Sequence, residues 1–471
     1  MTSLVNEAYA ILHNNGSTKM KLRPTLLHAL RLLCLTPLLL TGVPVQAQQV
    51  SVPPEKPIQD EWDMGEWAEP EQQTYRINGY VEAAVGWRIS DDPVINGRST
   101  LADLRAQLQV DRDFSQSRIS LSADVYYDGV LDQAKAQVRE LAWQGNLSSL
   151  GQWGTKIDAK LGQQVLTWGT GDYVFLNDLF AKDFQSFFAG RDDEYLKAPS
   201  LSAKFSGYFD WANIDVVLTP EFTPDNYING DYFSFFSPQY SPISGTNVAP
   251  SFNVTGAQLP SSPEYAVRIS KSLGSTELAL YGYRGFYKSP SSMTDTGQHY
   301  FSALRVYGAS AITPFAQGLF NAEFAYYDST DDEHGSHPQI PNSQARYLLG
   351  YEQELIKNLT GSVQWYLEHT AEYAALVSHS LTPEFEPARS RIVVTQRLMY
   401  RALQQTLTFN AFNFYSTSDA DGYLKFSTDY SPTDDWRLTG GVNVFYGDQP
   451  HTFFNQFSDA SNAFIRLRLF Y

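Results

Sequence analysis

The feature that most limits how this chain can fold is a strict alternation of apolar and polar residues, which runs in segments of about ten residues from Tyr75 to Tyr471. In the segment 100–113, leucine, alanine and valine alternate with aspartate, arginine and glutamine. A period of two places the two sets on opposite faces of a β-strand. The pattern therefore predicts strands with one wet face and one apolar face.

The lengths of the connections separate a barrel from a soluble sandwich. Every second connection is short, as at 114–115 and 274–275, whereas most of the others are long, as at 170–200 and 221–263. Short turns at one end and long loops at the other are typical of bacterial transmembrane barrels. We therefore predict an all-β fold, a single transmembrane antiparallel β-barrel of about 18 strands (16–18), which is wide enough for an aqueous channel. The strands are expected near 76–89, 100–113, 116–128, 135–145, 154–169, 201–208, 211–219, 264–273, 276–287, 299–312, 317–328, 343–356, 360–373, 389–402, 404–416, 422–431, 435–447 and 461–471.

The first 74 residues do not follow the alternation. From Met20 the chain has a basic start, an apolar region and the small-residue exit Val45-Gln46-Ala47, the layout of a secretory signal. We therefore assign residues 1–47 to a translation start placed too far upstream plus a signal peptide cleaved near Ala47. Residues 48–74 are assigned to a flexible periplasmic segment, and 75–471 to the barrel. The sole cysteine, Cys34, falls in the signal, so the mature chain is expected to lack disulfides and thiolate metal sites.

Composition excludes two classes of protein. The net charge of -17 argues against a nucleic-acid partner, because phosphate binding needs a basic face. A mean hydropathy of -0.32 excludes a helical membrane protein, while the aromatic content of 14% is in keeping with interfacial girdles.

The last segment carries an alternating apolar row that ends on an aromatic residue at the chain terminus. This row resembles the C-terminal signature of Gram-negative outer-membrane proteins, which the barrel-assembly machinery reads. The resemblance implies an outer-membrane porin in contact with lipid and lipopolysaccharide, and a homotrimer is possible. Because an open sheet edge is not tolerated in hydrocarbon, we expect this strand to pair with the first one. The row consists of Ala463, Ile465, Leu467, Leu469 and Tyr471.

A weaker likeness covers Gly162–Gly169, which reads GQQVLTWG. It resembles a strand with glycine, a basic residue, glutamine, three residues and tryptophan-glycine in a group of uncharacterised outer-membrane barrels encoded beside exporters. Gln163 replaces the basic residue, and the downstream loop departs from the pattern. The likeness implies, as an alternative function, a channel for lipid or hydrophobic compounds partnered with an exporter.

The loop after the fifth predicted strand is long, acidic and rich in phenylalanine. Resemblance to porins implies that this third extracellular loop folds into the pore and forms its constriction; a surface lid is the alternative. Phe180, Phe184, Phe187 and Phe188 are candidates for pinning it to the wall. We expect Asp172, Asp178, Asp183, Asp192 and Asp193 to face the basic wall across water. The candidate constriction residues are Asp172, Asp178, Asp183, Arg191, Asp192, Asp193 and Glu194.

The alternation also places more basic than acidic side chains on the inward face. Rows of arginine in a water-filled pore select for anions. In the alternative interpretation, these charges only solvate the wall and pair with one another. The candidate pore-lining residues are Arg389, Arg391 and Arg397 on one strand, and Arg437, Arg466 and Arg468 on the last two strands.

The sequence therefore predicts a porin for passive uptake of small hydrophilic, anionic solutes such as organic acids, with no cofactor and no enzymatic activity. An outer-membrane hydrolase is the second alternative, for which Ser378-His379-Ser380 is the nearest candidate, without a spacing that specifies a partner. His334 and His337 lie in a short polar loop, and a solvated loop tip is a better interpretation than a metal site.

Overall fold

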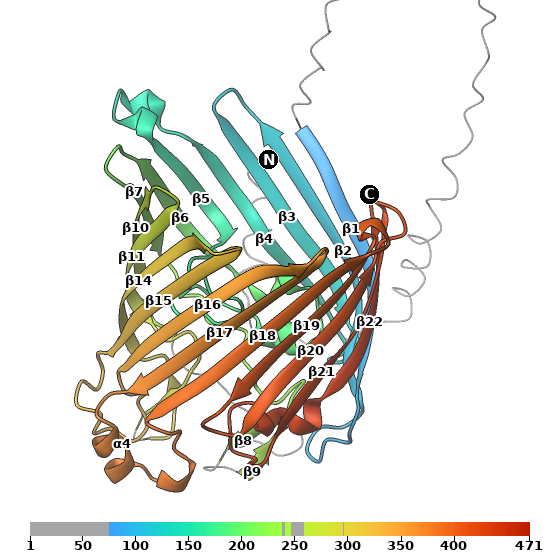
Figure 1. Ribbon diagram of the computed structural model, residues 1–471, viewed down its shortest axis with the longest axis vertical. Helices are drawn as coiled ribbons and strands as arrows, with labels where there is room; N and C mark the ends of the chain where they lie inside the picture. The colour runs from blue at the N-terminus through green and yellow to red at the C-terminus, as the bar shows by residue number, and fades with distance from the viewer. Residues whose placement is uncertain (1–74, 238–240, 246–258, 295) are drawn as a thin grey trace, which may run out of the picture. The chain divides into compact units, whose positions relative to one another are not determined.

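The computed structural model describes residues 75–237, 241–245, 259–294 and 296–471, so the predicted signal and N-terminal segment lie outside the described residues. Eighteen strands form one antiparallel sheet that curls into a barrel (Figure 1). This confirms the predicted fold class. The strands are β1 (Tyr75–Arg88), β2 (Ser99–Asp113), β3 (Ser117–Asp128), β4 (Gln133–Asn146), β5 (Ile157–Val165), β6 (Pro199–Tyr208), β7 (Asn213–Thr219), β10 (Glu264–Leu273), β11 (Thr276–Phe286), β14 (Ala303–Phe315), β15 (Gly318–Ser329), β16 (Gln344–Ile356), β17 (Leu359–Thr370), β18 (Ser390–Ala402), β19 (Leu407–Ser416), β20 (Asp421–Tyr430), β21 (Trp436–Gly447) and β22 (Asn462–Phe470).

The barrel closes by pairing its first and last strands, as the sequence predicted. β1 and β22 are antiparallel, with Tyr80 opposite Phe470 and Arg88 opposite Asn462. Beyond the ladder, Tyr471 N donates to Gly79 O at 3.0 Å, and Gly79 N donates to Tyr471 O at 3.1 Å. Closure satisfies the backbone groups that would otherwise form an open edge.

The two ends of the barrel differ. Short turns such as 274–275 and 357–358 lie at the end of the barrel that carries the C-terminus, and the long loops lie at the other end (Figure 1). Three connections depart from this rule: the turn 147–156 is long, and the loops 129–132 and 417–420 are short. By the usual layout of such barrels, the short turns are periplasmic and the long loops extracellular.

Short helices and two small hairpins lie in the connections between the barrel strands. None of the helices in the described part of the chain is long and apolar enough to cross a membrane. The loop between β5 and β6, residues 166–198, is called loop 3 below. The elements are α3 (Phe184–Ala189) in loop 3, α4 (Tyr373–His379), the hairpins β8 (Phe235–Ser237) with β9 (Ser241–Ser244) and β12 (Ser292–Met293) with β13 (His299–Tyr300), and the 3-10 helices η2 (Ser148–Leu150), η3 (Gly154–Lys156), η4 (Asp193–Leu196), η5 (Pro383–Phe385), η6 (Leu403–Gln405) and η7 (Asn455–Ala460).

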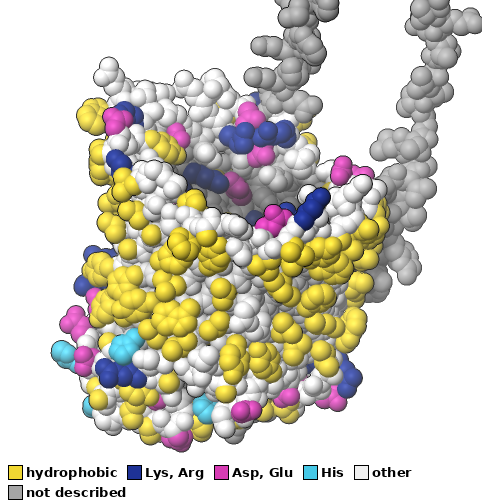
Figure 2. Space-filling view, in the orientation of Figure 1, with side chains coloured by type: hydrophobic (Ala, Val, Ile, Leu, Met, Phe, Trp, Pro, Cys, Tyr) yellow, Lys and Arg dark blue, Asp and Glu magenta, His cyan; other side chains and the backbone are white. Residues whose placement is uncertain are grey.

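Outward-facing apolar side chains are exposed along the strands, and Figure 2 shows them as an apolar belt on one face of the barrel. In β22, Ile465, Leu467 and Leu469 are exposed on the outer face, whereas Arg466 and Arg468 are buried on the inner face. The alternation read from the sequence therefore corresponds to lipid-facing and lumen-facing positions. Figure 2 also shows the open mouth at the short-turn end, hollowed and bordered by charged side chains.

Candidate functional site: the lumen and loop 3

Loop 3 crosses the lumen and is hydrogen-bonded to distant parts of the wall. On one side Gly171 N donates to Glu323 Oε1 of β15 at 2.9 Å. On the other, the amides of Asn443 in β21 and Asn462 in β22 donate to Phe188 O at 3.1 and 3.0 Å. Five strands separate β15 from β21 around the barrel. The predicted inward fold of the third loop is therefore present.

Aromatic packing holds the same loop from its middle. Phe187 and Phe188 of α3 are buried. Phe188 meets Phe445 of β21 edge-on, with ring centroids 5.1 Å apart, and it also lies 5.4 Å from Tyr423 of β20. Such edge-on contacts add to the free energy gained by burying the rings. Phe180, also buried, packs edge-on to Trp168 at 5.1 Å within the loop.

Four loop carboxylates bind basic side chains of the wall directly. The sequence interpretation placed three of them, Asp172, Asp192 and Asp193, across water from the basic wall, so the structure corrects it on this point. The contacts neutralise part of the positive wall and anchor the loop at the same time. The pairs are Asp172 with Arg397 (2.5 Å), Asp192 with Arg466 (2.9 Å), Asp193 with Lys425, and Glu194 with Arg468 (3.2 Å).

Asp192 differs from the other three carboxylates in lying near two arginines, Arg466 and Arg468. Its carboxylate also lies 3.5 Å from Arg468 and accepts from Glu194 N at 3.2 Å. Burial alone would raise the pKa of this loop carboxyl, but the charges of Arg466 and Arg468 outweigh burial and hold the pKa below its usual range. Asp192 therefore stays ionised in the pore.

Two predicted constriction acids do not face the wall, which is a second correction. Asp183 is the N-cap of α3: its carboxylate accepts from Ser186 N at 2.7 Å. Asp178 is buried and binds Lys182 Nζ at 2.9 Å within the loop, and Lys197 Nζ lies 3.8 Å from its other oxygen. Both acids organise the loop itself, and Asp178 also lines a chamber on the extracellular side of the loop.

Arg191, also a predicted constriction residue, is directed to the part of the wall formed by β2 and β3. Its Nε donates to Asp103 Oδ2 of β2 at 2.7 Å, and its Nη2 lies 3.7 Å from Asp128 of β3. All three side chains are buried. Loop 3 thus contacts β2 and β3 as well as β15 and the last strands.

Five of the six predicted pore-lining arginines fall into three groups. Arg397, Arg466 and Arg468 bind loop 3, as described above. Arg391 binds Asp419 at 2.6 Å. Arg389 is exposed and precedes β18, which begins at Ser390, so the sequence placed the strand boundary too early and included a residue outside the strand.

Arg437 faces the lumen from β21, and no carboxylate of a described residue lies within the 4.0 Å that defines an ion pair. The same holds for Arg401 of β18, which the sequence analysis missed. Arg401 shares the inward parity of Arg391 and Arg397, so the alternation contained the signal. The sequence analysis missed Arg401 because it lies at the end of the strand, where strand boundaries are hardest to predict.

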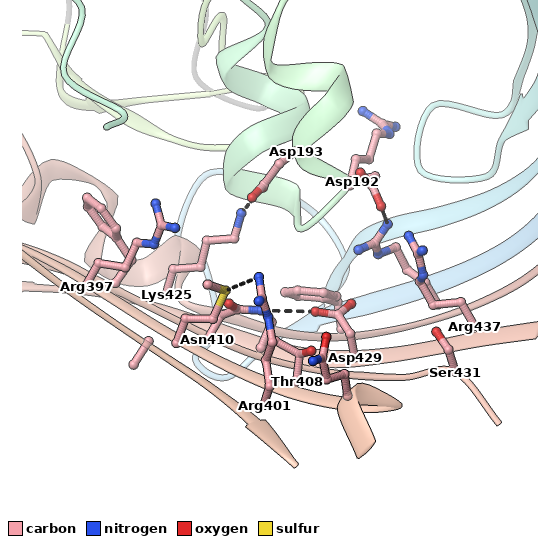
Figure 3. Close-up of a pocket in the computed structure, with 18 of the residues that line it drawn as sticks. Asp192, Asp193, Arg397, Arg401, Thr408, Asn410, Lys425, Asp429, Ser431 and Arg437 are labelled. Carbon is pink, nitrogen blue, oxygen red and sulfur yellow. Dashed lines mark hydrogen bonds and ion pairs between the residues drawn. The ribbon is translucent and has the colours of Figure 1, made fainter. Parts of the chain in front are cut away.

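A chamber of about 500 Å³ opens between loop 3 and the short-turn end of the wall. We call it the periplasmic chamber. Figure 3 shows Asp192 and Asp193 reaching into it from loop 3, while Arg401, Arg437 and Lys425 reach in from the strands. Its charged lining consists of the basic residues Arg191, Arg397, Arg401, Lys425, Arg437 and Arg466 and the acidic residues Asp192, Asp193 and Asp429.

Two chambers lie on the other side of loop 3, with volumes of about 380 and 290 Å³. We call them the extracellular chambers. Aromatic rings make up most of the lining of the smaller chamber and about half of that of the larger one, which also carries the charged residues Asp178, Lys182, Asp225, Lys288, Arg346, Glu368 and Arg391. The lumen therefore changes in character across loop 3, from a lining rich in aromatic rings to one that is mainly polar and basic. The rings common to both extracellular chambers are Tyr173, Phe175, Phe184, Phe414, Phe453 and Phe454.

The candidates for other chemistry lie away from the lumen. Ser378 and His379 are exposed on α4, and their Oγ and Nδ1 atoms are 3.2 Å apart. His379 Nδ1 also lies 2.8 Å from Ala375 O of the same helix. Among the described residues, no group of three or more potential ligands could hold a metal ion.

A closed eighteen-stranded barrel with an apolar outer belt and a polar lumen crossed by its third loop defines the porin architecture. No family model matches the sequence, and neither does any curated protein. Among solved structures, the chain is similar to a BenF-like porin from Pseudomonas fluorescens Pf-5, with 11% identity, a TM-score of 0.50, and 85% of this chain and 98% of that chain covered.

Two further solved structures are matched over a similar share of this chain. Acinetobacter baumannii OccAB3 has 10% identity and a TM-score of 0.49, with 84% of this chain and 99% of that chain covered. Pseudomonas aeruginosa OccK11 has 9% identity and a TM-score of 0.48, with 84% and 95% covered. The fold is that of an outer-membrane porin, and the closed barrel with its apolar belt places the protein in the bacterial outer membrane.

Proposed function

We propose that the protein is a channel for the passive uptake of small hydrophilic solutes, with a preference for anions. The observation that carries this proposal is the charge of the periplasmic chamber, where six basic side chains meet three acidic ones. Ion pairs with loop 3 or with the wall use most of the basic groups. Arg401 and Arg437 are left without a carboxylate partner among the described residues, so their charge is available to a passing solute.

The size of the chamber supports a small solute. A volume of about 500 Å³ lies within the range of ordinary small-molecule sites. Guanidinium groups bind carboxylates and phosphates in forked geometry, and a chamber with several of them lowers the free energy of an anion relative to a cation. Organic acids fit both requirements.

The test is single-channel recording in planar bilayers under a KCl gradient. The proposal expects steady conductance and a reversal potential displaced toward the chloride equilibrium potential. Liposome swelling should also be faster with a small organic acid than with a neutral sugar of similar size. Absence of conductance, or a preference for potassium, would remove this function.

A second function is favoured by one observation, the aromatic lining of the extracellular chambers. Such a lining suits a lipid or another hydrophobic compound, which was the first alternative from the sequence. It predicts binding of an apolar fluorescent probe together with little ion conductance. The same recordings therefore separate the two functions.

A further inference from the structure

We propose that Tyr173 sets the size limit for solutes that cross loop 3. This inference rests on the proposed channel function and assigns its limiting step to one side chain. Among the residues that the structure describes, only Tyr173 lines the periplasmic chamber and both extracellular chambers. We therefore place this ring on the path of a solute that moves between the two sides.

Contacts from loop 3 and the wall hold the ring across the passage. It meets Phe412 of β19 edge-on, with centroids 4.8 Å apart and an interplanar angle of 86°. Phe187 of α3 lies on its other side at 5.1 Å. The hydroxyl donates to Asp193, whose carboxylate also binds Lys425 of β20. The side chain is thus fixed by two rings and one charge-assisted hydrogen bond.

The backbone conformation of Tyr173 indicates that contacts with the surrounding structure hold this residue in place. Its φ of 56° lies in the left-handed region, which is unfavourable for a residue with a bulky side chain. Such conformations persist where the surrounding structure holds them, and they are concentrated at functional sites. Here Asp172 N donates to Gln364 Oε1 at 3.3 Å, and the Asp172 side chain binds Arg397, so the preceding residue is fixed to the wall.

The position along the barrel is in keeping with this role. Phe412 lines the periplasmic chamber, whereas Phe414, the next inward residue of β19, lines the extracellular chambers. Tyr173 therefore lies at the level where the lining changes from basic and polar to aromatic. Removing its ring would join the chambers directly.

The test compares Tyr173→Ala with wild type in bilayers to which neutral polymers of increasing size are added. The variant should conduct roughly twofold or more above wild type and admit larger polymers, because the narrowest point is widened. Phe453→Ala is the matched control. It also removes an aromatic ring, but one that lines only the extracellular chambers, so its polymer cut-off should stay at the wild-type value.

An unchanged polymer cut-off in Tyr173→Ala, with a conducting wild type, would overturn the assignment of Tyr173 and leave the channel function standing. A silent wild type would instead overturn the channel function. Should Tyr173→Ala fail to assemble, Tyr173→Cys serves as the second variant in a chain whose sole cysteine, Cys34, is replaced by serine. A charged thiol reagent should then block conductance, and unaltered conductance after complete labelling would refute the proposal.

An independent observation concerns the outer wall. Arg284 of β11 and Arg305 of β14 lie directly opposite each other in the strand register and are both exposed. Their neighbours Tyr283 and Leu304 are buried on the lumen side, so the two guanidinium groups project outward. Both arginines are at the loop end of their strands, near the extracellular face.

Like charges at directly opposed strand positions destabilise a sheet. No carboxylate of a described residue lies within 4.0 Å of either guanidinium, although Asp328 is opposite Arg305 in the register. Next to them on the outer face, Tyr265 and Tyr307 are 50% and 55% exposed, as expected of an interfacial aromatic girdle. We infer that the pair binds phosphate groups of lipopolysaccharide in the outer leaflet, because paired guanidinium groups suit phosphate recognition.

The test measures the thermal unfolding of purified protein with added lipopolysaccharide. Wild type should be stabilised, and the double variant Arg284→Gln/Arg305→Gln should lose most of that shift. Arg112→Gln removes an exposed arginine at the periplasmic end and is the matched control. An equal shift in the double variant would overturn the site, whereas an equal shift with inorganic phosphate or dephosphorylated lipopolysaccharide would overturn the lipid-phosphate assignment.

Discussion

The double variant Arg401→Gln/Arg437→Gln should reduce anion selectivity without disturbing the barrel. Both side chains face the periplasmic chamber, and neither has a carboxylate partner among the described residues (Figure 3). Glutamine keeps a polar side chain of similar length and removes only the charge. The formal charge of the chamber lining then falls from +3 to +1, because six basic and three acidic residues become four and three.

The magnitude follows from the dimensions of the chamber. A volume of about 500 Å³ equals that of a sphere of about 5 Å radius, so a central anion is some 6 Å from a charge on the wall. Coulomb's law in water gives about 0.7 kcal/mol at that distance, and a Debye length of about 10 Å leaves roughly 0.4 kcal/mol. Two charges contribute about 0.8 kcal/mol, which is roughly a fourfold change in anion concentration.

The assay is the reversal potential under a KCl gradient at about 0.1 M ionic strength. Arg389→Gln is the matched control, because it removes a positive charge from an exposed loop position outside β18. Raising the salt to about 1 M should abolish the difference between double variant and wild type, since the Debye length falls to about 3 Å. A reversal potential in the double variant equal to that of wild type at low salt would refute the reasoning.

Three further predictions concern stability and assembly. Asp183→Ala removes the N-cap of α3 and should cost about 1 kcal/mol, measured by denaturant unfolding in detergent, with Asp183→Asn as the capping control. Asp103→Ala leaves the buried charge of Arg191 without its main partner and should cost about 3–5 kcal/mol; a loss under 1 kcal/mol would contradict the pairing. Gly79→Val should impair closure, seen as loss of heat-modifiable gel mobility, because a Cβ there would overlap the main-chain oxygen of Gln107 in β2, which cannot move aside as a side chain can, and would lie 2.5 Å from the Tyr471 hydroxyl oxygen.

The barrel could be predicted from the sequence because its geometry is periodic. A strand residue has two possible faces, and a transmembrane barrel makes one face apolar and the other polar. In β22 this rule assigned Leu467 to lipid and Arg468 to the lumen, and both assignments are confirmed. The closing pair β1–β22 follows from the same physics, since hydrocarbon does not tolerate an open edge.

The partners of loop 3 could not be predicted, because a loop has no period. Asp183 and Asp193 are the same residue type in the same acidic segment, yet one caps α3 and the other binds Lys425 across the lumen. The difference depends on where the helix begins and on the path of the chain, neither of which alternation reports. Strand ends are similarly uncertain, which is why Arg389 was included and Arg401 missed.

The ion pairs of loop 3 change how the basic wall should be interpreted. Arg466 and Arg468 bind loop carboxylates, so their charge holds the loop in place and is only partly available to solutes. The alternative from the sequence, that inward charges pair with one another, thus describes these two residues. Under the proposed function, anion selectivity then depends on the remainder, Arg401 and Arg437, which are the basic residues of the periplasmic chamber with no carboxylate partner among the described residues. A selectivity loss on neutralising that remainder that exceeds the loss for a loop-bound arginine would support this division, and the reverse order would show that the loop-bound charges also act on solutes.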